Sequence, residues 1–334
     1  MERHLRAINK YSKDLLNKTN VIGVGVGYKK VRGVETEQLS LIIFVEKKLP
    51  SDRLSKSNVI PGKINGLYTD IVEIGRVRLL DNRVDRRRPA SPGISIGHYK
   101  ISAGTFGAVV KDKTTGEKLI LSNNHILANA TNGFDGRSSI GDPILQPGPH
   151  DGGGPNDQIA TLLRFIPIRH SIQDVECPVA AAALQAGNII IHIVRPRYNI
   201  RLTKYTNDMN IIDAAVAKPD KQSLVDEEVL EIGRIEGVAR VVPGESIKKS
   251  GRTSGLTEGK VQAIGVTIKV GITEEENGLF TDQVVSNILS QPGDSGSLIV
   301  NSEKKAVGLL FAGSDKYTVF NCIDNVMERL MVKF

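Results

Sequence analysis

From about Gly93 to Phe334, the chain is a succession of short apolar runs separated by glycine, asparagine and aspartate. Many short β-branched runs between turn residues favour a β-barrel or β-sandwich. The last segment, NCIDNVMERLMVKF, instead places its apolar residues at helical spacing. We therefore predict a mainly β domain that ends in a helix. The runs are TFGAVVKD, KLILS, DQIATLL, NIIDAAVA, GKVQAIGVTIKV, DQVVSNIL, GSLIV and KAVGLLFAG.

Residues 1–90 have a different pattern. A helical spacing over about Arg3–Asn17 is followed by three strand-like runs, NVIGVGVGYKK, LSLIIFVEKKL and TDIVEIGRVRLL. This order predicts a small α/β domain. The glycines of the first run are spaced GxGxG rather than GxGxxG, and no helical pattern follows them. A glycine-rich strand is therefore favoured over a dinucleotide-binding loop.

The net charge of +7 is unevenly distributed along the chain. Residues 1–90 contain 19 Lys+Arg and 10 Asp+Glu, a net of +9, which leaves −2 for the remainder. The basic run DNRVDRRRPASPG predicts a linker at about 81–92, before a second domain over 93–334. Aromatic residues for base stacking are few in the basic domain, so a solvated basic surface is favoured over nucleic-acid binding.

The cysteine count and the N-terminus bear on the compartment. The chain has 2 cysteines, which excludes a disulfide-stapled secreted scaffold. The N-terminal residues contain no apolar core of a secretion signal, and the sequence has no unbroken apolar run of membrane-spanning length. We expect a cytoplasmic protein with reduced thiols and no membrane segment, and no motif calls for a metal or a cofactor.

The strongest candidate for chemistry is the segment QPGDSGS, residues 291–297. Its serine, Ser295, lies between glycines on a predicted tight turn. Gly293 can adopt backbone angles closed to other residues, so the amides of Gly293 and Ser295 could form an oxyanion hole. For an isolated Gly-Asp-Ser-Gly, a polar turn without function remains an equal alternative.

A serine nucleophile needs a base, and the base needs an orienting carboxylate. His125 follows the apolar run KLILS at a predicted strand end, which would hold it on a rigid element, although a structural role remains open. Asp213 lies inside the apolar run NIIDAAVA, where an unpartnered carboxylate would be costly. The candidates therefore follow the order His125, Asp213, Ser295.

This order, together with five local motifs, resembles the trypsin/chymotrypsin-like serine proteases. The motifs are LSNNH, IIDAAVA, KSGRTSGLTEGKV, QPGDSGS and AVGLLFAGS, and they span about Gly104–Phe334. The resemblance implies a chymotrypsin-like double β-barrel with a C-terminal helix, carrying an insertion at about 132–208. In it, Ser295 would attack the peptide carbonyl, His125 would transfer the proton and Asp213 would orient His125.

The resemblance also implies roles for residues around the triad. Leu289 would lie at the base of the primary specificity pocket, so apolar or small substrate side chains are expected. Lys249 would pair with Asp294 and hold the oxyanion loop open without proteolytic activation. A further set would pair with the substrate backbone as an added strand: Phe311, Ala312 and Gly313.

The function predicted from these residues is that of a serine endopeptidase, a hydrolase acting in proteolysis on protein or peptide substrates. Two alternatives remain. One is a catalytically silent protease fold used for binding or assembly, and the other is a zymogen-like protease triggered by a partner through the N-terminal domain. That domain and the insertion also leave room for a homo-oligomer interface.

Overall fold

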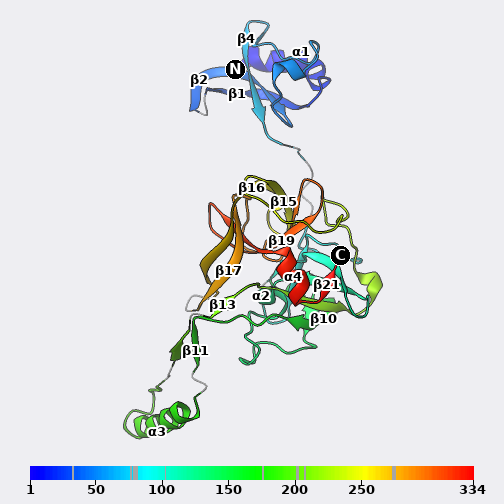
Figure 1. Cartoon of the computed structure of the whole chain (residues 1–334). Helices are drawn as coiled ribbons and strands as arrows, with labels where there is room; N and C mark the ends of the chain where they lie inside the picture. The colour runs from blue at the N-terminus through cyan, green and yellow to red at the C-terminus, as the bar shows by residue number, and fades with distance from the viewer. Residues whose placement is uncertain are drawn as a thin grey trace. The chain divides into compact units, whose positions relative to one another are not determined.

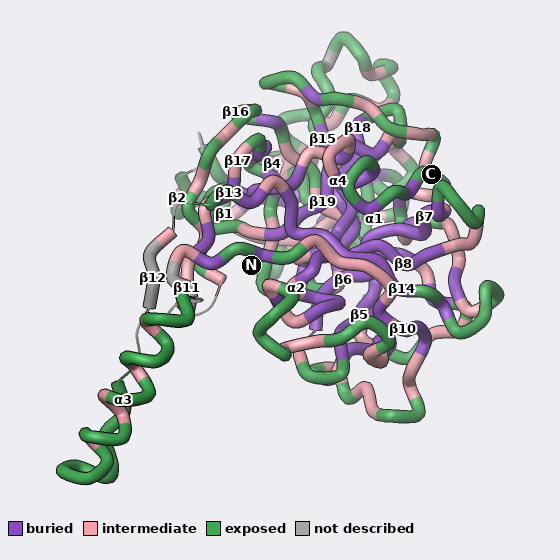
Figure 2. Tube along the Cα trace, turned by 60° about the horizontal axis from the view of Figure 1, so that its bottom comes forward, coloured by how far each residue is buried: buried purple, intermediate pink, exposed green. Residues whose placement is uncertain are grey.

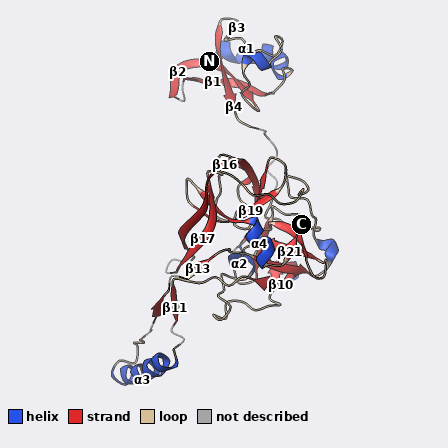
Figure 3. Ribbon diagram, viewed as in Figure 1, coloured by secondary structure: helices blue, strands red, loops and turns tan. Residues whose placement is uncertain are grey.

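The computed structural model describes residues 1–31, 34–75, 77, 82–101, 103–174, 177–200, 203–206, 208–272 and 276–334. The chain divides into two compact units, Met1–Asp81 and Asn82–Phe334, which are described separately. Both units are drawn in Figure 1, coloured along the chain. The second unit is built mainly from strands (Figure 3).

The first unit is the predicted small α/β fold. Helix α1 (Glu2–Leu16) packs on a four-stranded sheet of order β1-β2-β4-β3, in which β2 and β4 run parallel. Its core contains Ala7 and Leu15 from the helix and Leu41 and Ile43 from the sheet. The end of the predicted run TDIVEIGRVRLL lies largely outside the described residues. The strands are β1 (Val21–Val31), β2 (Val34–Val45), β3 (Lys63–Ile64) and β4 (Leu67–Glu73), and a short 3₁₀ turn spans Ser51–Arg53.

The glycines of the GxGxG run lie inside β1 and make room for side chains of the neighbouring strand. A Cβ on Gly23 would approach Phe44 to 3.3 Å, and one on Gly27 would approach Ile42 to 3.1 Å. The spacing therefore serves the packing of β1 against β2, as expected for a glycine-rich strand.

The first sheet of the second unit has eight strands in the order β21-β7-β8-β14-β10-β9-β5-β6. All of its pairings are antiparallel, and the strands are joined by tight turns such as the one at Gly116. In chain order the strands are β5 (Ser95–His98), β6 (Gly104–Thr105), β7 (Ala108–Asp112), β8 (Lys118–Ser122), β9 (Pro143–Leu145), β10 (Gln158–Phe165), β14 (Ala215–Pro219) and β21 (Val332–Lys333).

The second sheet closes on itself. Its order is β13-β17-β16-β15-β18-β19-β20, and β20 pairs back with β17. Ring closure removes the unpaired edges that an open sheet would expose. The strands are β13 (Met209–Asn210), β15 (Ser246–Gly251), β16 (Gly255–Gly271), β17 (Asn277–Ser286), β18 (Leu298–Asn301), β19 (Ala306–Gly313) and β20 (Thr318–Cys322).

One apolar cluster joins the two sheets. It combines Leu121 of β8 with Leu298 of β18 and Leu309 of β19, and it includes Val326 of helix α4 (Ile323–Arg329). Each sheet also has a core cluster of its own. The predicted fold class, two β-barrel-like sheets with a C-terminal helix after a small α/β unit, is confirmed. The helix is shorter than the predicted segment, because Met331 adopts a positive φ and the chain ends as β21.

The described part of the predicted linker, residues 82–92, is packed against the second unit rather than extended. Arg83 is buried and donates to the Gly93 carbonyl at 2.9 Å and to the Ser250 hydroxyl at 2.7 Å. Its guanidinium also contacts the carboxylate of Glu231. The basic run was expected to be solvated, but its first arginine instead satisfies buried acceptors far away in the sequence.

The insertion expected at 132–208 is also narrower than predicted. Its first half contributes β9 and β10 to the eight-stranded sheet, where Phe165 pairs with Ala215. Only the later part departs from the barrels: the short strands β11 (Ile172–Asp174) and β12 (Thr203–Tyr205) pair with each other and frame helix α3 (Pro178–Val194). Within the described residues, no helix has the length and apolar character needed to cross a membrane.

Candidate active site

His125 and Asp213 lie next to each other at the ends of two neighbouring strands of the first sheet. His125 lies in the short helix α2 (Asn124–Leu127), directly after β8, and Asp213 lies just before β14, the neighbour of β8. The His125 Nδ1 atom contacts Asp213 Oδ2, and the His125 backbone amide donates to Asp213 Oδ1 at 3.2 Å. The aspartate side chain is 4% exposed and the histidine 27%, so the carboxylate is buried while the ring reaches solvent.

The backbone of Asp213 is fixed by buried amides. Asn321 of β20 accepts a hydrogen bond from the Asp213 amide at 3.0 Å and donates to the Asp213 carbonyl at 3.1 Å. The same Asn321 side chain donates to the Leu309 carbonyl of β19 at 3.1 Å. Asn123, beside α2, donates to the Asp213 carbonyl at 2.8 Å. Asn321 therefore ties the backbone of Asp213, beside the first sheet, to the closed second sheet.

Ser295 lies in the turn before β18, next to both sheets. Its carbonyl accepts from the Thr105 amide of β6 at 2.8 Å. Its hydroxyl donates to the Phe311 carbonyl of β19 at 3.3 Å. Among the hydrogen bonds of the described residues, none joins Ser295 Oγ to His125. The serine is thus anchored between the sheets, with its hydroxyl directed to β19.

The predicted oxyanion loop has the backbone geometry that its sequence demands. Gly293 adopts a φ of +98°, and a Cβ there would collide with the Thr253 hydroxyl and the Arg252 guanidinium. Thr253 Oγ1 donates to the Pro292 carbonyl at 2.8 Å, and Thr105 Oγ1 donates to the Gly293 carbonyl at 2.8 Å. Because the Pro292 carbonyl is held from one side, the amide of the same peptide group, that of Gly293, points the opposite way.

The predicted pair of Lys249 and Asp294 is present in the second sheet. Lys249 Nζ lies 3.1 Å from Asp294 Oδ2, and neither side chain is exposed. The carboxylate also accepts from the Ser254 hydroxyl at 2.5 Å and from the amides of Thr253, Ser254 and Gln291 at 2.9–3.0 Å. Burial alone raises the pKa of Asp294, but Lys249 and these donors together hold that pKa below its usual value. Burial lowers the pKa of Lys249.

A second charged pair supports the same loop from the first sheet. Arg252 donates from Nε to Asp151 Oδ2 at 2.8 Å, and its Nη2 contacts the other carboxylate oxygen. The amide of Arg252 donates to Thr105 Oγ1 at 3.0 Å, the hydroxyl that in turn holds Gly293. Asp151 also accepts from the Ser95 hydroxyl at 2.5 Å. The loop therefore depends on contacts from both sheets.

The three residues of β19 that are expected to contact substrate differ in their exposure. Phe311 is buried as a side chain and packs 4.8 Å from the Phe280 ring, whereas Ala312 is half-buried and Gly313 is exposed. On β19, Ala312 and Gly313 pair with β20, while backbone pairing on the other edge ends at Leu310, which bonds Gly296 and Ser297 before β18. The opposite edge of Phe311–Gly313 therefore has no strand partner among the described residues.

Leu289 does not fit the predicted pocket base. Its side chain is 56% exposed, because residues 287–290 form an irregular surface segment whose Leu289 carbonyl accepts from Thr257. The hydroxyls of Ser290 and Thr318 instead lie 2.6 Å apart, and a Cβ on Gly313 would come within 3.0 Å of Ser290 Oγ. An exposed leucine cannot form the floor of an enclosed pocket, so this assignment is corrected.

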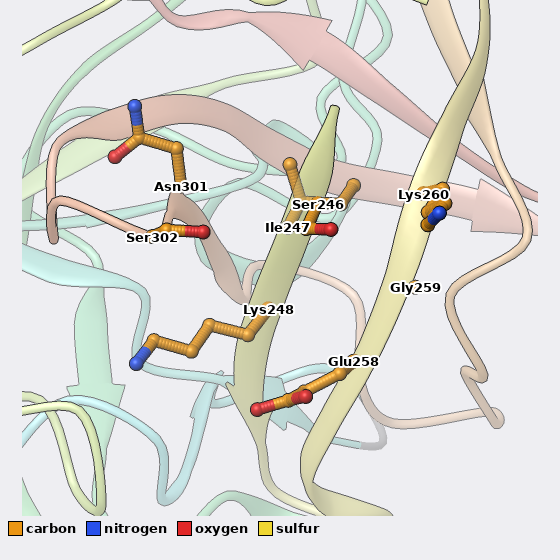
Figure 4. Close-up of a pocket in the computed structure, with 8 residues that line it drawn as sticks. All are labelled: Ser246, Ile247, Lys248, Glu258, Gly259, Lys260, Asn301 and Ser302. Atoms are coloured by element: carbon orange, nitrogen blue, oxygen red, sulfur yellow. The ribbon is translucent and has the colours of Figure 1, made fainter. Parts of the chain in front are cut away.

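The alternation of β15 separates two neighbouring lysines. Lys249 points inward to Asp294, whereas Lys248 points to the surface and lines a cavity of about 420 Å³ (Figure 4). Glu258 extends from the adjacent strand β16 beside Lys248, and Ser302 lies on the far wall. This cavity shares no residue with the triad. Among the described residues, no cluster of three or more His, Cys, Asp or Glu could hold a metal ion.

Several site residues were not identified from the sequence. Asn123 stands beside His125 in LSNNH, so adjacency could have drawn attention to it. Asn321, Thr253 and Arg83 carry no local signal, because their roles depend on contacts with residues distant in the chain.

Two closely packed β-sheets, a histidine in contact with a buried aspartate and a serine on a glycine-bounded turn are features of the chymotrypsin-like serine proteases. Sequence comparison finds similarity to bacterial serine proteases. The chain is 31% identical over 80 residues to Serine protease 2 of Streptomyces fradiae, covering 24% of this chain and 43% of that protein. It is 30% identical over 119 residues to Streptogrisin-D of Streptomyces griseus, covering 36% of this chain and 26% of that protein.

These matches span less than half the length of the curated relatives. No protein-family model matches the chain. Among solved structures, Thermobifida fusca Protease A aligns with a TM-score of 0.46 at 14% identity, covering 73% of this chain and 98% of that chain. Cellulomonas bogoriensis chymotrypsin aligns with a TM-score of 0.44 at 14% identity, over 73% of this chain and 98% of that chain.

Proposed function

We propose that the second unit is a serine endopeptidase that uses Ser295 as nucleophile, His125 as base and Asp213 as the orienting carboxylate. The observation that carries the proposal is the contact of His125 Nδ1 with the buried Asp213 carboxylate. Burial of a carboxylate is costly unless it is paired, and this pairing leaves the opposite ring nitrogen, Nε2, to accept a proton.

In the proposed reaction, the Ser295 hydroxyl rotates from the Phe311 carbonyl toward His125 and attacks the substrate carbonyl as His125 takes its proton. The amides of Gly293 and Ser295 then stabilise the oxyanion of the tetrahedral intermediate, and His125 returns the proton to the leaving amine. Water repeats the sequence on the acyl-enzyme. The Lys249–Asp294 pair would keep the oxyanion loop in place without cleavage of the chain.

The substrate is proposed to be a protein or peptide that adds a strand along Phe311–Gly313. The edge of β19 beyond Leu310, where pairing with the Ser295–β18 segment ends, supports this mode of binding. A preference for apolar or small side chains stays a prediction, and the exposed Leu289 does not support it. A cytoplasmic location also stays a prediction; Cys177 and Cys322 are both free thiols.

A second candidate function is favoured by one specific observation. The Ser295 hydroxyl donates to Phe311 rather than to His125, as expected of a zymogen-like protease that awaits a partner or of a silent binding protein. Arg83 offers a route for such control, because the segment that follows the first unit reaches Ser250, the neighbour of Lys249. A silent scaffold would carry the fold and bind without hydrolysis.

Labelling by a fluorophosphonate probe tests the proposal on the full chain. Wild type should be labelled, Ser295→Ala should not, and His125→Ala should be labelled far more slowly because the base is lost. Ser302→Ala, at an exposed serine outside the site, is the matched control and should behave as wild type. Labelling that persists in Ser295→Ala would refute the nucleophile. Absence of labelling in wild type would favour the zymogen-like or silent alternative.

A further inference from the structure

Helix α3 presents an exposed apolar surface. Its residues, Pro178–Val194, include no Asp, Glu, Lys or Arg, and none of them is buried. Val179 and Ile193 are each 78% exposed and Ile190 is 65% exposed. Figure 2 shows the helix exposed along its length. Contiguous apolar surface of this kind marks an interaction site on a folded protein.

The chain itself covers the polar stripe of α3. Asn188 binds the backbone of Ile200 with both side-chain atoms, at 2.7 and 3.0 Å, and His192 Nε2 lies 2.8 Å from Asn199 Oδ1. Gln185 lies on the same stripe, three residues before Asn188, and lines a hollow with it. The returning segment therefore satisfies the polar groups of the helix. Large apolar side chains on the remaining faces stay exposed, among them Val179, Ile190 and Ile193.

The side-chain volumes along α3 are asymmetric. The first half contains the run of small residues Ala180–Ala183, and the second half contains the large run Ile189–Val194, interrupted only by His192. When two identical helices lie antiparallel, the small half of each faces the large half of the other, so the volumes match. A parallel pair would place large against large. The surface most complementary to α3 is therefore a second α3 in the opposite direction, related by a two-fold axis.

The absence of charge also bears on the occupant. A helix that rests on a lipid surface normally has a charged face opposite its apolar one. The stripe opposite the apolar faces of α3 instead includes no Asp, Glu, Lys or Arg, and its Asn188 and His192 are already hydrogen-bonded within the chain; Arg195 and Arg197 lie beyond the C-terminal end of the helix. An apolar partner surface therefore fits the uncharged faces of α3, and each copy of the chain presents one.

We propose that α3 is a self-association element through which two copies of the chain pair antiparallel. At 1.5 Å per residue and a diameter of about 10 Å, the helix has a lateral surface of about 800 Å², and pairing covers about half of it on each partner. The total buried area is then about 800 Å², below the ~1,200–2,000 Å² of stable complexes. The dimer is therefore concentration-dependent rather than permanent. This inference does not depend on the proposed peptidase activity.

Sedimentation velocity on the full chain tests the association. Wild type should shift from monomer to dimer as its concentration rises from micromolar to hundreds of micromolar. The double variant Ile190→Glu/Ile193→Glu should remain monomeric, because both side chains are exposed in the monomer and would be buried in the pair. Phe134→Glu is the matched control, since Phe134 is 92% exposed in the same unit but outside α3. A wild-type monomer at every concentration, or a dimer retained by the double variant, overturns the proposal.

Oxidative cross-linking tests the orientation with a native thiol. Cys177 is exposed at the N-terminal end of α3, so an antiparallel pair places the two Cys177 residues at opposite ends of the helix pair. Under oxidation, the variant Val194→Cys should form a disulfide between Cys177 of one copy and the introduced thiol at position 194 of the other, identified by peptide mapping. Wild type should give no Cys177–Cys177 disulfide, and such a dimer would refute the antiparallel pair. Binding of the monomer to phosphatidylcholine–phosphatidylserine vesicles, lost in the double variant, would assign α3 to a lipid surface instead and overturn self-association.

Discussion

Substitution of Lys249 by methionine should destabilise the second unit and weaken the proposed active site together. Lys249 Nζ and Asp294 Oδ2 lie 3.1 Å apart with neither side chain exposed. Methionine fills a similar volume without the charge, so Asp294 would be left buried with no cation beside it. The same carboxylate precedes Ser295 and holds the turn that carries Gly293, which is why stability and activity should fall together.

The magnitude follows from the donors that remain. Removal of one member of a buried ion pair costs about 3–5 kcal/mol of the free energy of unfolding. The Ser254 hydroxyl and three backbone amides still donate to Asp294, so we expect the lower end, about 3 kcal/mol. At about 2–4 °C per kcal/mol for a domain of this size, the Tm should fall by about 6–12 °C. Full loss of an oxyanion donor sets the upper bound on the rate effect, a factor of about 10²–10³.

Differential scanning calorimetry and the rate of fluorophosphonate labelling measure the two effects. Lys248→Met is the matched control, because the adjacent lysine points to the surface cavity of Figure 4 and away from Asp294. It should leave the Tm and the labelling rate close to wild type. Should Lys249→Met unfold at the temperature of Lys248→Met and be labelled at the wild-type rate, the assignment of Lys249 as support of the oxyanion loop is wrong.

Three further results are expected. Hydrogen bonds from backbone amides and an arginine lower the pKa of Asp112 to about 2, so its contribution to stability is complete above its ordinary pKa and is lost as pH falls toward 2. Asp112→Asn should therefore flatten the loss of unfolding free energy at acid pH, and an unchanged loss would contradict this contribution. Asn321→Leu should slow labelling and lower stability, because it leaves the buried Asp213 amide without its acceptor at a cost of about 1–3 kcal/mol, whereas Asn123 still donates to the Asp213 carbonyl. Wild-type behaviour on both measures would exclude a positioning role for Asn321. Thr253→Val should lower kcat about two- to twelvefold with KM little changed, because a hydrogen bond of about 0.5–1.5 kcal/mol orients the peptide group of Gly293. Thr253→Ser should restore kcat, and a change confined to KM would count against this role of Thr253.

Local signals in the sequence were sufficient for the triad candidates and for the fold class. His125 and Asp213 are each marked by a polar residue at the end of or within an apolar run, and Ser295 is marked by its flanking glycines. The structure shows the first two in contact, and it places Ser295 on the turn between the sheets. The alternation of short apolar runs and turns was enough to predict a mainly β unit. Successive side chains of a strand point to opposite faces, so the strand pattern can be recognised from neighbouring residues in the sequence.

The prediction of Leu289 failed for a physical reason. Leu289 was assigned to the pocket by its position relative to Ser295. Whether its side chain points inward depends instead on the path of the surface segment and on the hydroxyls that lie beside Gly313. Likewise, the basic run before Gly93 has the composition of a solvated linker. Burial of Arg83 depends on acceptors supplied by Ser250 and Glu231, more than a hundred residues later.

By itself, the sequence determined which segments form strands and helices, which residues could serve as base, carboxylate and nucleophile, and where the positive charge resides. Only the tertiary structure decided that β20 returns to β17 and closes the second sheet, and that Asn321 links Asp213 to that sheet. It also decided that α3 keeps its apolar faces exposed. The physical reason is the range of the interactions: periodicity and turn geometry act between neighbours in the chain, whereas burial and hydrogen-bond pairing are set by residues that the fold brings together.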